Sequence, residues 1–384
     1  MKLFDDIDRT FKGPANHNEN TFDYYQRCVR KDISIIRNKL NEWFQDCPDS
    51  EKKELKNSFK KSFDDCFFEL FLFQLFQNLG FKIIVHPNLK NSSKRPDFLV
   101  SRDNLELYVE AKIVKDKSKK EEGLERKINK FYDDFSRIKI KGFLLCIDEF
   151  VVKTKQQPNS KAALRHIENE LKNIDPEKLI KDFENNGFDR IPIIKFEDED
   201  LKITVKPMPV IPSAGTKENK RPIGIYPGEI FWGGGEESMR ESINFKAKKY
   251  GELDKPFIVC INSLNFKTSG KIDIEDAIWG SQAISWSEDP DNRDEHWIRK
   301  RDGIFLDKKG PRLKNLSGVF VTKLYPHNIP SAEYWIFENP FSTNSFNFKE
   351  LDLPYNYIKE GKIIRATGNS FDEILQIPKN WTTI

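Results

Sequence analysis

The first part of the chain alternates between helical and strand-like spacings of apolar residues. Apolar side chains recur every three or four positions over residues 21–46, which predicts a helix. A lysine-rich helix follows and continues into a Phe-rich helix over residues 59–79, which Gly80 ends. Short apolar runs then predict three strands, over residues 81–86, 97–100 and 105–113.

A charged helix and a buried strand complete this block. Residues 115–138 are mostly charged and predict a loop followed by a helix. Residues 143–150 are apolar at consecutive positions, as in a strand that is covered on both faces. The predicted order across residues 59–150 is therefore helix, three strands, helix, strand. Beyond it, residues 160–187 predict helix broken once by proline, and residues 191–207 predict a hairpin.

The second half begins with an irregular stretch over residues 207–235. It carries five prolines and three consecutive glycines, which indicates a connecting segment. The pattern then predicts a helix over residues 236–250, a strand, another helix, a charged loop over residues 280–302 and three more strands. We therefore expect an α/β protein with four regions: an N-terminal helical region (1–58), a core domain (59–206), the connecting segment (207–235) and a second α/β domain (236–384).

The composition narrows the class of protein. The 64 Lys and Arg residues nearly balance the 61 Asp and Glu residues, so net charge gives no argument for a nucleic-acid partner. The five cysteines are odd in number and are not spaced as zinc-binding pairs, which indicates reduced thiols in a cytoplasmic protein. The first residues lack the apolar core of a signal peptide, and the longest apolar run is too short to span a bilayer. We therefore expect no membrane partner.

The strand predicted at residues 105–113 carries charged side chains in an informative pattern. Side chains alternate between the two faces of a strand. One face holds Leu107, Val109, Ala111 and Ile113, and the other holds Glu106, Tyr108, Glu110 and Lys112. We expect the first face to be core and the second to lie outside it. If this strand forms a hairpin with the preceding one, Asp97 lies beside Glu110.

Two carboxylates at one point predict a cation between them. Like charges repel, and oxygen ligands favour a hard divalent ion, Mg²⁺ or Mn²⁺. Lys112 lies on the same face as Glu110 and would be placed to hold or activate a water molecule beside the ion. Such a site suits hydrolysis of a phosphodiester, because the metal acts as a Lewis acid and positive charge stabilises the developing phosphorane.

Two short motifs, Pro96-Asp97 and Glu110-Ala111-Lys112, resemble the active-site signature of the PD-(D/E)XK nuclease superfamily, here a bacterial branch. That superfamily has the restriction-endonuclease-like fold, whose core runs helix, three strands, helix, strand. The resemblance implies that Asp97 and Glu110 bind Mg²⁺, that the Ala111 carbonyl adds a ligand, and that Lys112 serves the water. It also implies an endonuclease, with DNA favoured over RNA as the substrate, in restriction or defence against phage.

Glu69 is a further candidate for the same site. Many members of that superfamily carry a catalytic, metal-binding glutamate on the first core helix, and Glu69 lies at the corresponding place. Helical spacing puts it between Phe73 and Phe76, where a carboxylate is costly unless it is paired or metal-bound. A surface residue at the helix edge is the alternative. Some subfamilies also carry Gln and Tyr four residues apart on the next helix, but here Ile128 precedes Tyr132, unlike the recombination-exonuclease branch.

Two groups of basic residues are candidates for contact with nucleic acid. They are Lys115, Lys119 and Lys120 after the lysine-bearing strand, and Arg299, Lys300 and Arg301 beside Trp297. Basic residues bind phosphates, and aromatic residues among them suit stacking on bases. Each group is equally compatible with an ordinary solvated surface.

The alternatives to a nuclease come from other functional classes. Short Pro-Asp and Glu-x-Lys strings also occur in solvated edge strands. A catalytically inactive nucleic-acid-binding module on the same fold is therefore one alternative. A scaffold or sensor whose partner supplies the activity is another. We expect the C-terminal domain to serve recognition or regulation, with a homo-oligomer or a defence-system protein as the protein partner.

Overall fold

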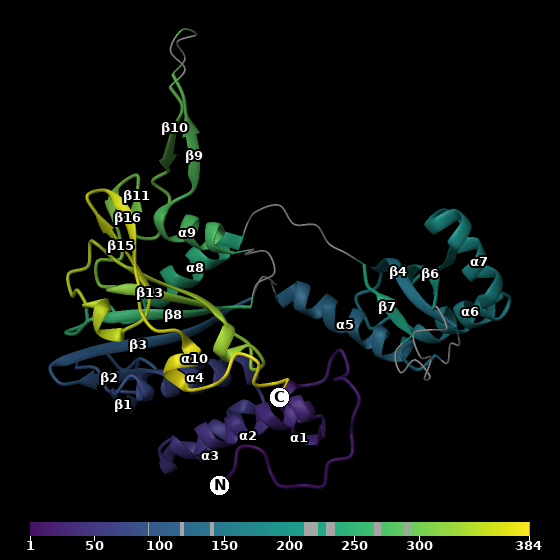
Figure 1. Ribbon diagram of the computed structural model, residues 1–384, viewed down its shortest axis with the longest axis horizontal. Coiled ribbons are helices and arrows are strands. Elements are labelled where there is room, and N and C mark those ends of the chain that lie inside the picture. The colour runs from purple at the N-terminus through teal and green to yellow at the C-terminus, as the bar shows by residue number, and fades with distance from the viewer. Residues whose placement is uncertain are drawn as a thin grey trace. The chain divides into compact units, whose positions relative to one another are not determined.

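The chain forms a mixed α/β protein whose residues divide into two compact units (Figure 1). The computed structural model describes residues 1–90, 92–115, 119–138, 142–210, 222–227, 235–264, 270–287, 291 and 294–383. Unit 1 comprises Met1–Phe11, Thr21–Asp116 and Trp232–Ile384, and unit 2 comprises Lys12–Asn20 and Lys117–Phe231. Within the described ranges, no helix has both the length and the apolar character needed to cross a membrane.

Unit 1 is built on an eight-stranded mixed sheet. Its strands are β1 Lys82–Val85, β2 Phe98–Arg102, β3 Leu105–Val114, β8 Phe257–Ser263, β13 Gly318–Lys323, β14 Glu333–Glu338, β15 Tyr355–Lys359 and β16 Lys362–Ala366. They lie in the order β1-β2-β3-β8-β13-β14-β15-β16. The first three strands form an antiparallel meander, and β3, β8 and β13 run parallel.

The centre of this sheet is covered on both faces, which explains its sequence. Every residue of β8 is buried, and β13 is buried except at Lys323. Such continuous apolar runs are typical of parallel strands between two layers of helices. The pairing of β3 with β8 extends in register from Tyr108 opposite Phe257 to Val114 opposite Ser263.

Helices cover the sheet from both sides. They are α1 Thr21–Arg27, α2 Lys31–Asp46, α3 Asp49–Phe59, α4 Phe63–Asn78, α8 Gly235–Ala247, α9 Lys271–Trp279 and α10 Phe371–Leu375. Figure 1 shows α4 on one side of β3 and α8 and α9 on the other. The ring of Phe73 on α4 contacts Phe98 of β2, whereas Met239 and Ile243 on α8 share a core with Tyr108 of β3.

The N-terminal helices complete the layer on the α4 side. The ring of Trp43 on α2 packs on that of Phe71 on α4, and the Trp43 carbonyl accepts a hydrogen bond from Gln74. Because α4 is enclosed by the sheet and by these helices, it is apolar around almost its whole circumference. The predicted N-terminal helical region is therefore present, and it packs against the core.

Unit 2 has its own sheet and its own core. Its elements are α5 Lys119–Phe135, β4 Phe143–Val152, α6 Ser160–Lys172, α7 Pro176–Asn186, β5 Ile194–Glu197, β6 Leu201–Pro209 and β7 Ile223–Ile225. The strand order is β5-β6-β4-β7, and the predicted hairpin is the antiparallel pair β5–β6. Pro176 begins α7, where its missing N–H costs nothing, so it separates two helices as predicted.

The prediction that the helix before residue 138 and the strand at residues 143–150 complete the core sheet is wrong. These segments form α5 and β4 of unit 2, and β4 pairs with β6 and β7 instead. The strand beside β3 is β8, which the pattern of apolar residues placed in a separate C-terminal domain. The predicted boundaries at 59–206 and 236–384 therefore do not coincide with the two units, because β3–β8 pairing joins both segments in unit 1.

Three local predictions also need correction. The Phe-rich helix begins at Phe63, since α3 ends separately at Phe59. The charged loop at residues 280–302 contains an antiparallel hairpin, β9 Gln282–Ser285 with β10 His296–Arg299. The connecting segment at residues 207–235 is strand at both β6 and β7, and most of its remainder lies outside the described residues.

The two separate cores predict two unfolding transitions. Leu145 of β4 and Ile261 of β8 are both fully buried, in unit 2 and unit 1 respectively. Leu145→Ala and Ile261→Ala should each cost about 2–5 kcal/mol of stability. Calorimetric scans should show Leu145→Ala lowering one transition and Ile261→Ala lowering the other. Equal displacement of one shared transition by both variants would contradict the division into units.

Candidate active site

The β2–β3 hairpin brings the predicted residues together as expected. Phe98 pairs with Val109, so Asp97, immediately before β2, lies next to Glu110 and Ala111. The Asp97 Oδ2 atom accepts a hydrogen bond of 2.6 Å from the Ala111 N–H. The predicted proximity of Asp97 to the Glu110-Ala111-Lys112 motif is therefore present in the fold.

Glu110 is fully buried, and its carboxylate is held by three side chains from α8 and the residues that follow it. The Lys246 ammonium donates to Oε1, and the Lys249 ammonium donates to the same oxygen at 2.8 Å. The Tyr250 hydroxyl donates to Oε2. An ionised carboxylate removed from water costs several kcal/mol unless it is paired and hydrogen-bonded. These contacts supply that compensation within the protein.

The expectation that the charged face of β3 lies outside the core is wrong. Tyr108 and Glu110 on that face are both buried. The face is covered because α8 packs over β3 and β8, with Tyr108 in the same apolar cluster as Met239 and Ile243. Glu110 therefore points into a layer between sheet and helix, where its charge must be met by neighbouring side chains.

Glu69 on α4 belongs to the same electrostatic group. Burial is the main cause that raises its pKa, to about 8, and repulsion by Asp97 is the next. Glu69 also lines a pocket of about 120 Å³ between α3, α4 and the end of β1, together with Glu51, Glu54 and His86. Glu69 is therefore half-buried at this pocket, and Asp97 and Glu110 repel its carboxylate.

Burial and the neighbouring Glu110 carboxylate also raise the pKa of Asp97 and of Tyr250. Burial and then repulsion by Glu110 raise the pKa of Asp97 above its usual value. Burial, followed by the hydrogen bond to Glu110, raises the pKa of Tyr250, so its hydroxyl keeps its proton and remains a donor. The site therefore favours groups that bring positive charge or a proton.

Ala111 and Lys112 follow Glu110 directly along β3. Ala111 is buried and follows Glu110 along β3, while Lys112 is only partly exposed. Among the residues described, Lys112 has no hydrogen-bond or ion-pair partner, in contrast to Lys246 and Lys249. The Lys112 ammonium is thus available to a ligand that enters from solvent.

The basic residues predicted to contact nucleic acid are dispersed. Their positions are as follows: Lys115 follows β3 in unit 1, Lys119 and Lys120 begin α5 in unit 2, and Arg299, Lys300 and Arg301 lie at the end of β10. Lys115 forms an ion pair of 2.8 Å with Asp64, and Arg299 forms ion pairs with Glu275 and Asp276. The side chain of Lys119 lies outside the described residues, and Lys120, Lys300 and Arg301 are exposed.

The donors at the site suit a hard divalent ion in kind. Carboxylates of Glu69, Asp97 and Glu110 and the carbonyl of Ala111 are the oxygen ligands that Mg²⁺ or Mn²⁺ prefers. In the part of the chain that the structure describes, no three His, Cys, Asp or Glu side chains lie close enough together to hold a metal ion. Both oxygens of Glu110 already accept hydrogen bonds, so a metal ion would have to exchange with the lysines.

Sequence reasoning missed Lys246, Lys249 and Tyr250. Their spacing of three and four residues resembles a helical pattern, but α8 ends at Ala247, so only Lys246 lies on the helix. Nothing in that spacing named Glu110 as their partner, 136 residues away for Lys246. Only the pairing of β3 with β8 brings α8 over the site.

Comparisons with known proteins do not assign the chain to a family. No family model matches it, and the searches of curated proteins and of solved structures likewise found no match. Function is therefore argued from the geometry and electrostatics of the site.

The raised pKa of Glu69 predicts a pH dependence of stability. Below about pH 4.5 the carboxyl is protonated in both folded and unfolded chains, and between there and about pH 8 only the folded chain keeps the proton. Stability should therefore fall as pH rises through this window. Glu69→Gln removes the titration and should gain about 1–3 kcal/mol relative to wild type between pH 5 and pH 8.5, allowing for solvent in the pocket.

Urea unfolding at several pH values measures this difference. Glu54→Gln is the matched control, because Glu54 lines the same pocket but is exposed. Its stability should follow the wild-type pH profile. Parallel profiles for wild type and Glu69→Gln would show that Glu69 ionises normally in the fold.

Proposed function

We propose that this protein is a metal-dependent nuclease that hydrolyses phosphodiester bonds, with DNA as the favoured substrate. The observations that carry the proposal are that Asp97 lies next to Glu110, that both carboxylates repel the carboxylate of Glu69, and that Lys112 follows Glu110 by two residues on β3. Carboxylates that repel one another in a buried site favour a divalent cation, and a neighbouring lysine can serve water or phosphate. The setting we propose, bacterial restriction or defence against phage, rests on the resemblance alone.

The order of elements in unit 1 supports this proposal. Reading α4, β1, β2, β3, α8 and β8 gives helix, three strands, helix, strand, the order of the PD-(D/E)XK core. Here residues 117–231 are inserted between β3 and α8. The predicted order of elements is therefore kept, but its second helix and fourth strand are α8 and β8, and not α5 and β4. A family shares chemistry only where its site residues are present, so the fold order is supporting evidence and no more.

The chemistry assigns a separate task to each group. A bound Mg²⁺ or Mn²⁺, held by Asp97 and Glu110 with the Ala111 carbonyl and Glu69 as further donors, would act as a Lewis acid toward the phosphate. We assign to the Lys112 ammonium the positioning of the attacking water, because it lies on the face of β3 that carries Glu110. The water oxygen would form a bond to phosphorus and give up a proton to solvent, the bond from phosphorus to the leaving oxygen would break, and that oxygen would take up a proton from solvent.

Lys246 and Lys249 extend this assignment. If Glu110 bound a cation, the ammonium groups of Lys246 and Lys249 would lose their carboxylate partner and would remain beside the site. Positive charge there would bind the negatively charged phosphate of the substrate and its transition state. The same lysines would thus hold Glu110 in the absence of metal and contact phosphate in its presence.

One observation favours a second candidate, an inactive nucleic-acid-binding module. Glu110 is already satisfied by two ammonium groups and one hydroxyl, so the site is compensated without any metal ion. A protein of this kind would bind nucleic acid and leave it intact. Binding without cleavage, in the presence of Mg²⁺ or Mn²⁺, distinguishes this candidate from the nuclease.

Lys112→Ala tests the nuclease most directly. With Mg²⁺ or Mn²⁺, the wild type should cut DNA, and Lys112→Ala should reduce single-turnover cleavage by about 100-fold or more, because the group that positions water is lost. Lys82→Ala, an exposed lysine on β1, is the control and should cleave as wild type does. Circular dichroism should show both variants folded. Full activity of Lys112→Ala in preparations free of other nucleases would refute the assigned site.

Metal binding should also appear as stabilisation. A cation that binds only the folded chain raises the melting temperature by mass action. Mn²⁺ should therefore raise the Tm of the wild type, and Asp97→Asn should weaken that response because one ligand charge is lost. Asp8→Asn, at an exposed carboxylate, is the control. If Mn²⁺ raised the Tm of Asp97→Asn as much as that of wild type, Asp97 would not be a ligand.

A further inference from the structure

A β-hairpin extends from unit 1 as an arm that the proposed chemistry does not use. It consists of β9 and β10, which are paired in register from Gln282 opposite Arg299 to Ser285 opposite His296. Figure 1 shows it rising beyond the end of α9, away from the main sheet. We call β9, β10 and the described residues next to them, Trp286, Ser287, Asp291, Asp294 and Glu295, the arm.

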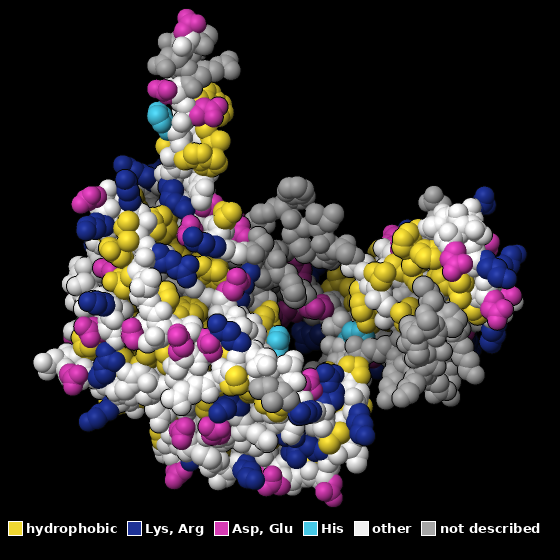
Figure 2. All heavy atoms as spheres, in the orientation of Figure 1, with side chains coloured by type: hydrophobic (Ala, Val, Ile, Leu, Met, Phe, Trp, Pro, Cys, Tyr) yellow, Lys and Arg dark blue, Asp and Glu magenta, His cyan; other side chains and the backbone are white. Residues whose placement is uncertain are grey.

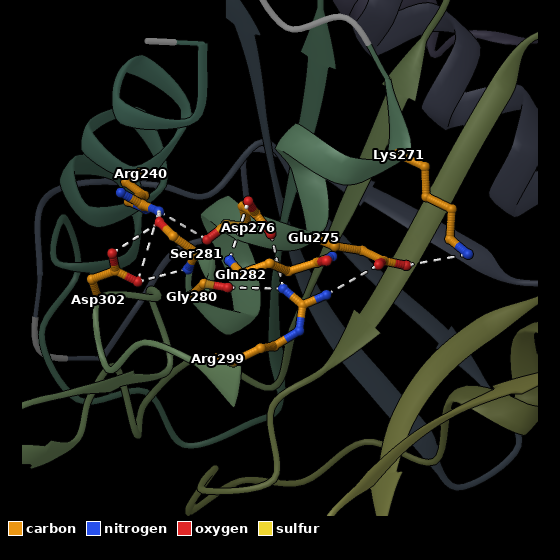
Figure 3. A network of polar contacts seen from close by, with 9 residues as sticks. All are labelled: Arg240, Lys271, Glu275, Asp276, Gly280, Ser281, Gln282, Arg299 and Asp302. Carbon is orange, nitrogen blue, oxygen red and sulfur yellow. Dashed lines mark hydrogen bonds and ion pairs between the residues drawn. The ribbon is translucent and has the colours of Figure 1, made fainter. Parts of the chain in front are cut away.

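The arm is fixed at its foot by a polar network (Figure 3). Arg299 donates to Asp276 at 3.0 Å and to the Gly280 carbonyl at 2.8 Å. Asp302 accepts hydrogen bonds from the N–H and the hydroxyl of Ser281, at 2.8 and 2.9 Å. Because the strands of the arm are joined to α9 by several charged contacts, the arm leaves the body in a defined direction.

Two glycines make this joint close-packed. Gly280 has a φ of +100°, and a Cβ there would lie 2.0 Å from the Lys300 carbonyl oxygen. A Cβ on Gly303 would lie 2.5 Å from the Ile278 carbonyl oxygen. Side chains are excluded at both positions. Gly280 therefore packs against the backbone of Lys300, and Gly303 packs against the backbone of Ile278.

One face of the arm is apolar and exposed. Ile284 and Trp297 lie directly opposite each other in the ladder and therefore share a face. Trp286 is the first residue after β9, and alternation along the strand predicts the same face for it. Trp297, Trp286 and Ile284 are 73%, 63% and 41% exposed. Figure 2 shows hydrophobic side chains exposed on the arm. Large exposed aromatic residues grouped in this way mark interaction surfaces.

Among the residues of the arm that the structure describes, the charge changes sign from the tip to the foot. Towards the tip, Asp291, Asp294 and Glu295 are exposed carboxylates. At the foot, Lys300 and Arg301 are exposed, as are Lys308 and Lys309 in the turn between the short strands β11 Leu306–Asp307 and β12 Gly310–Pro311. Figure 2 shows the acidic side chains on the outer part of the arm and basic ones where it meets the body.

From these two properties we infer that the arm is a self-association surface, and that its partner is the arm of a second copy of this chain. Two arms packed antiparallel about a two-fold axis bring their tryptophan faces together. The same arrangement places the acidic tip of each arm beside the basic foot of the other. A two-fold contact must be self-complementary, and an arm with an apolar face and opposite charges at its ends meets that condition.

The acidic tip argues against nucleic acid as the partner of this arm. Phosphates would be repelled by Asp294 and Glu295, and Arg299 is already engaged by Glu275 and Asp276. A contact confined to one hairpin face is smaller than the roughly 1,200–2,000 Å² of most stable interfaces. We therefore expect reversible dimers, with a Kd in the micromolar range.

Sedimentation velocity over about 1–200 μM protein measures this association, since that range brackets a micromolar Kd. The wild type should pass from monomer to dimer as concentration rises. Trp286→Ser with Trp297→Ser should weaken the dimer by about tenfold or more, because the aromatic contacts are lost. Phe188→Ser is the matched control: Phe188 is 66% exposed in unit 2 and lies outside the arm, so its loss should leave dimerisation unchanged.

Charge reversal tests the antiparallel arrangement specifically. Lys300→Glu with Arg301→Glu makes foot and tip both acidic, and Asp294→Lys with Glu295→Lys reverses the tip instead. Each variant alone should dimerise more weakly than wild type. An equal mixture of the two should restore dimers, because each acidic end then meets a basic end. Circular dichroism confirms that all variants are folded.

Three results would overturn the inference. One is a wild type that stays monomeric throughout the concentration range. Another is a mixture of the two charge-reversed variants that associates no better than either alone. The third is loss of affinity for a short DNA duplex in Trp286→Ser/Trp297→Ser with its dimerisation unchanged, which would make the arm a nucleic-acid contact.

Discussion

A carboxylate buried at the centre of a sheet has to be neutralised where it lies, and Glu110 is such a group. Its side chain is inaccessible to solvent, and Lys246, Lys249 and Tyr250 provide its counter-charge and its hydrogen bonds. Removing one partner of such a pair is far more damaging than the pair is stabilising, because a charge is left alone in a poor solvent. This requirement holds the end of α8 against β3, although more than a hundred residues separate them in the chain. The same contacts fix the position of α8 over the sheet and the surroundings of Glu110.

In the proposed nuclease, the same interaction would give the site two states, one with and one without a divalent ion. Lys246 and Lys249 balance Glu110, while burial, followed by repulsion between the carboxylates, raises the pKa of Glu69 and of Asp97. A divalent ion would relieve that repulsion and release two ammonium groups for phosphate. In the proposed nuclease, metal binding and the charge needed for substrate would thus be coupled through one carboxylate.

The local parts of this arrangement could be read from the sequence, and the distant parts could not. Alternation along residues 105–113 and the short turn after Arg102 fix the β2–β3 hairpin, and the hairpin alone places Asp97 beside Glu110. The strand beside β3 was assigned wrongly because β4 and β8 are both continuous apolar runs. Each is typical of a buried strand, and neither pattern says which sheet it enters. The burial of Glu110 was not predicted for the same reason. It depends on α8, which precedes β8 in the chain.

The position of a divalent ion in crystals soaked with Mn²⁺ tests the account most directly. Anomalous scattering locates manganese independently of any assumption about its ligands. The proposed nuclease predicts a peak between the carboxylates of Asp97 and Glu110, with the Lys246 ammonium moved away from Glu110. A structure with no peak there, in which Glu110 keeps both lysines at saturating Mn²⁺, would contradict it and favour a module that binds nucleic acid without cutting it.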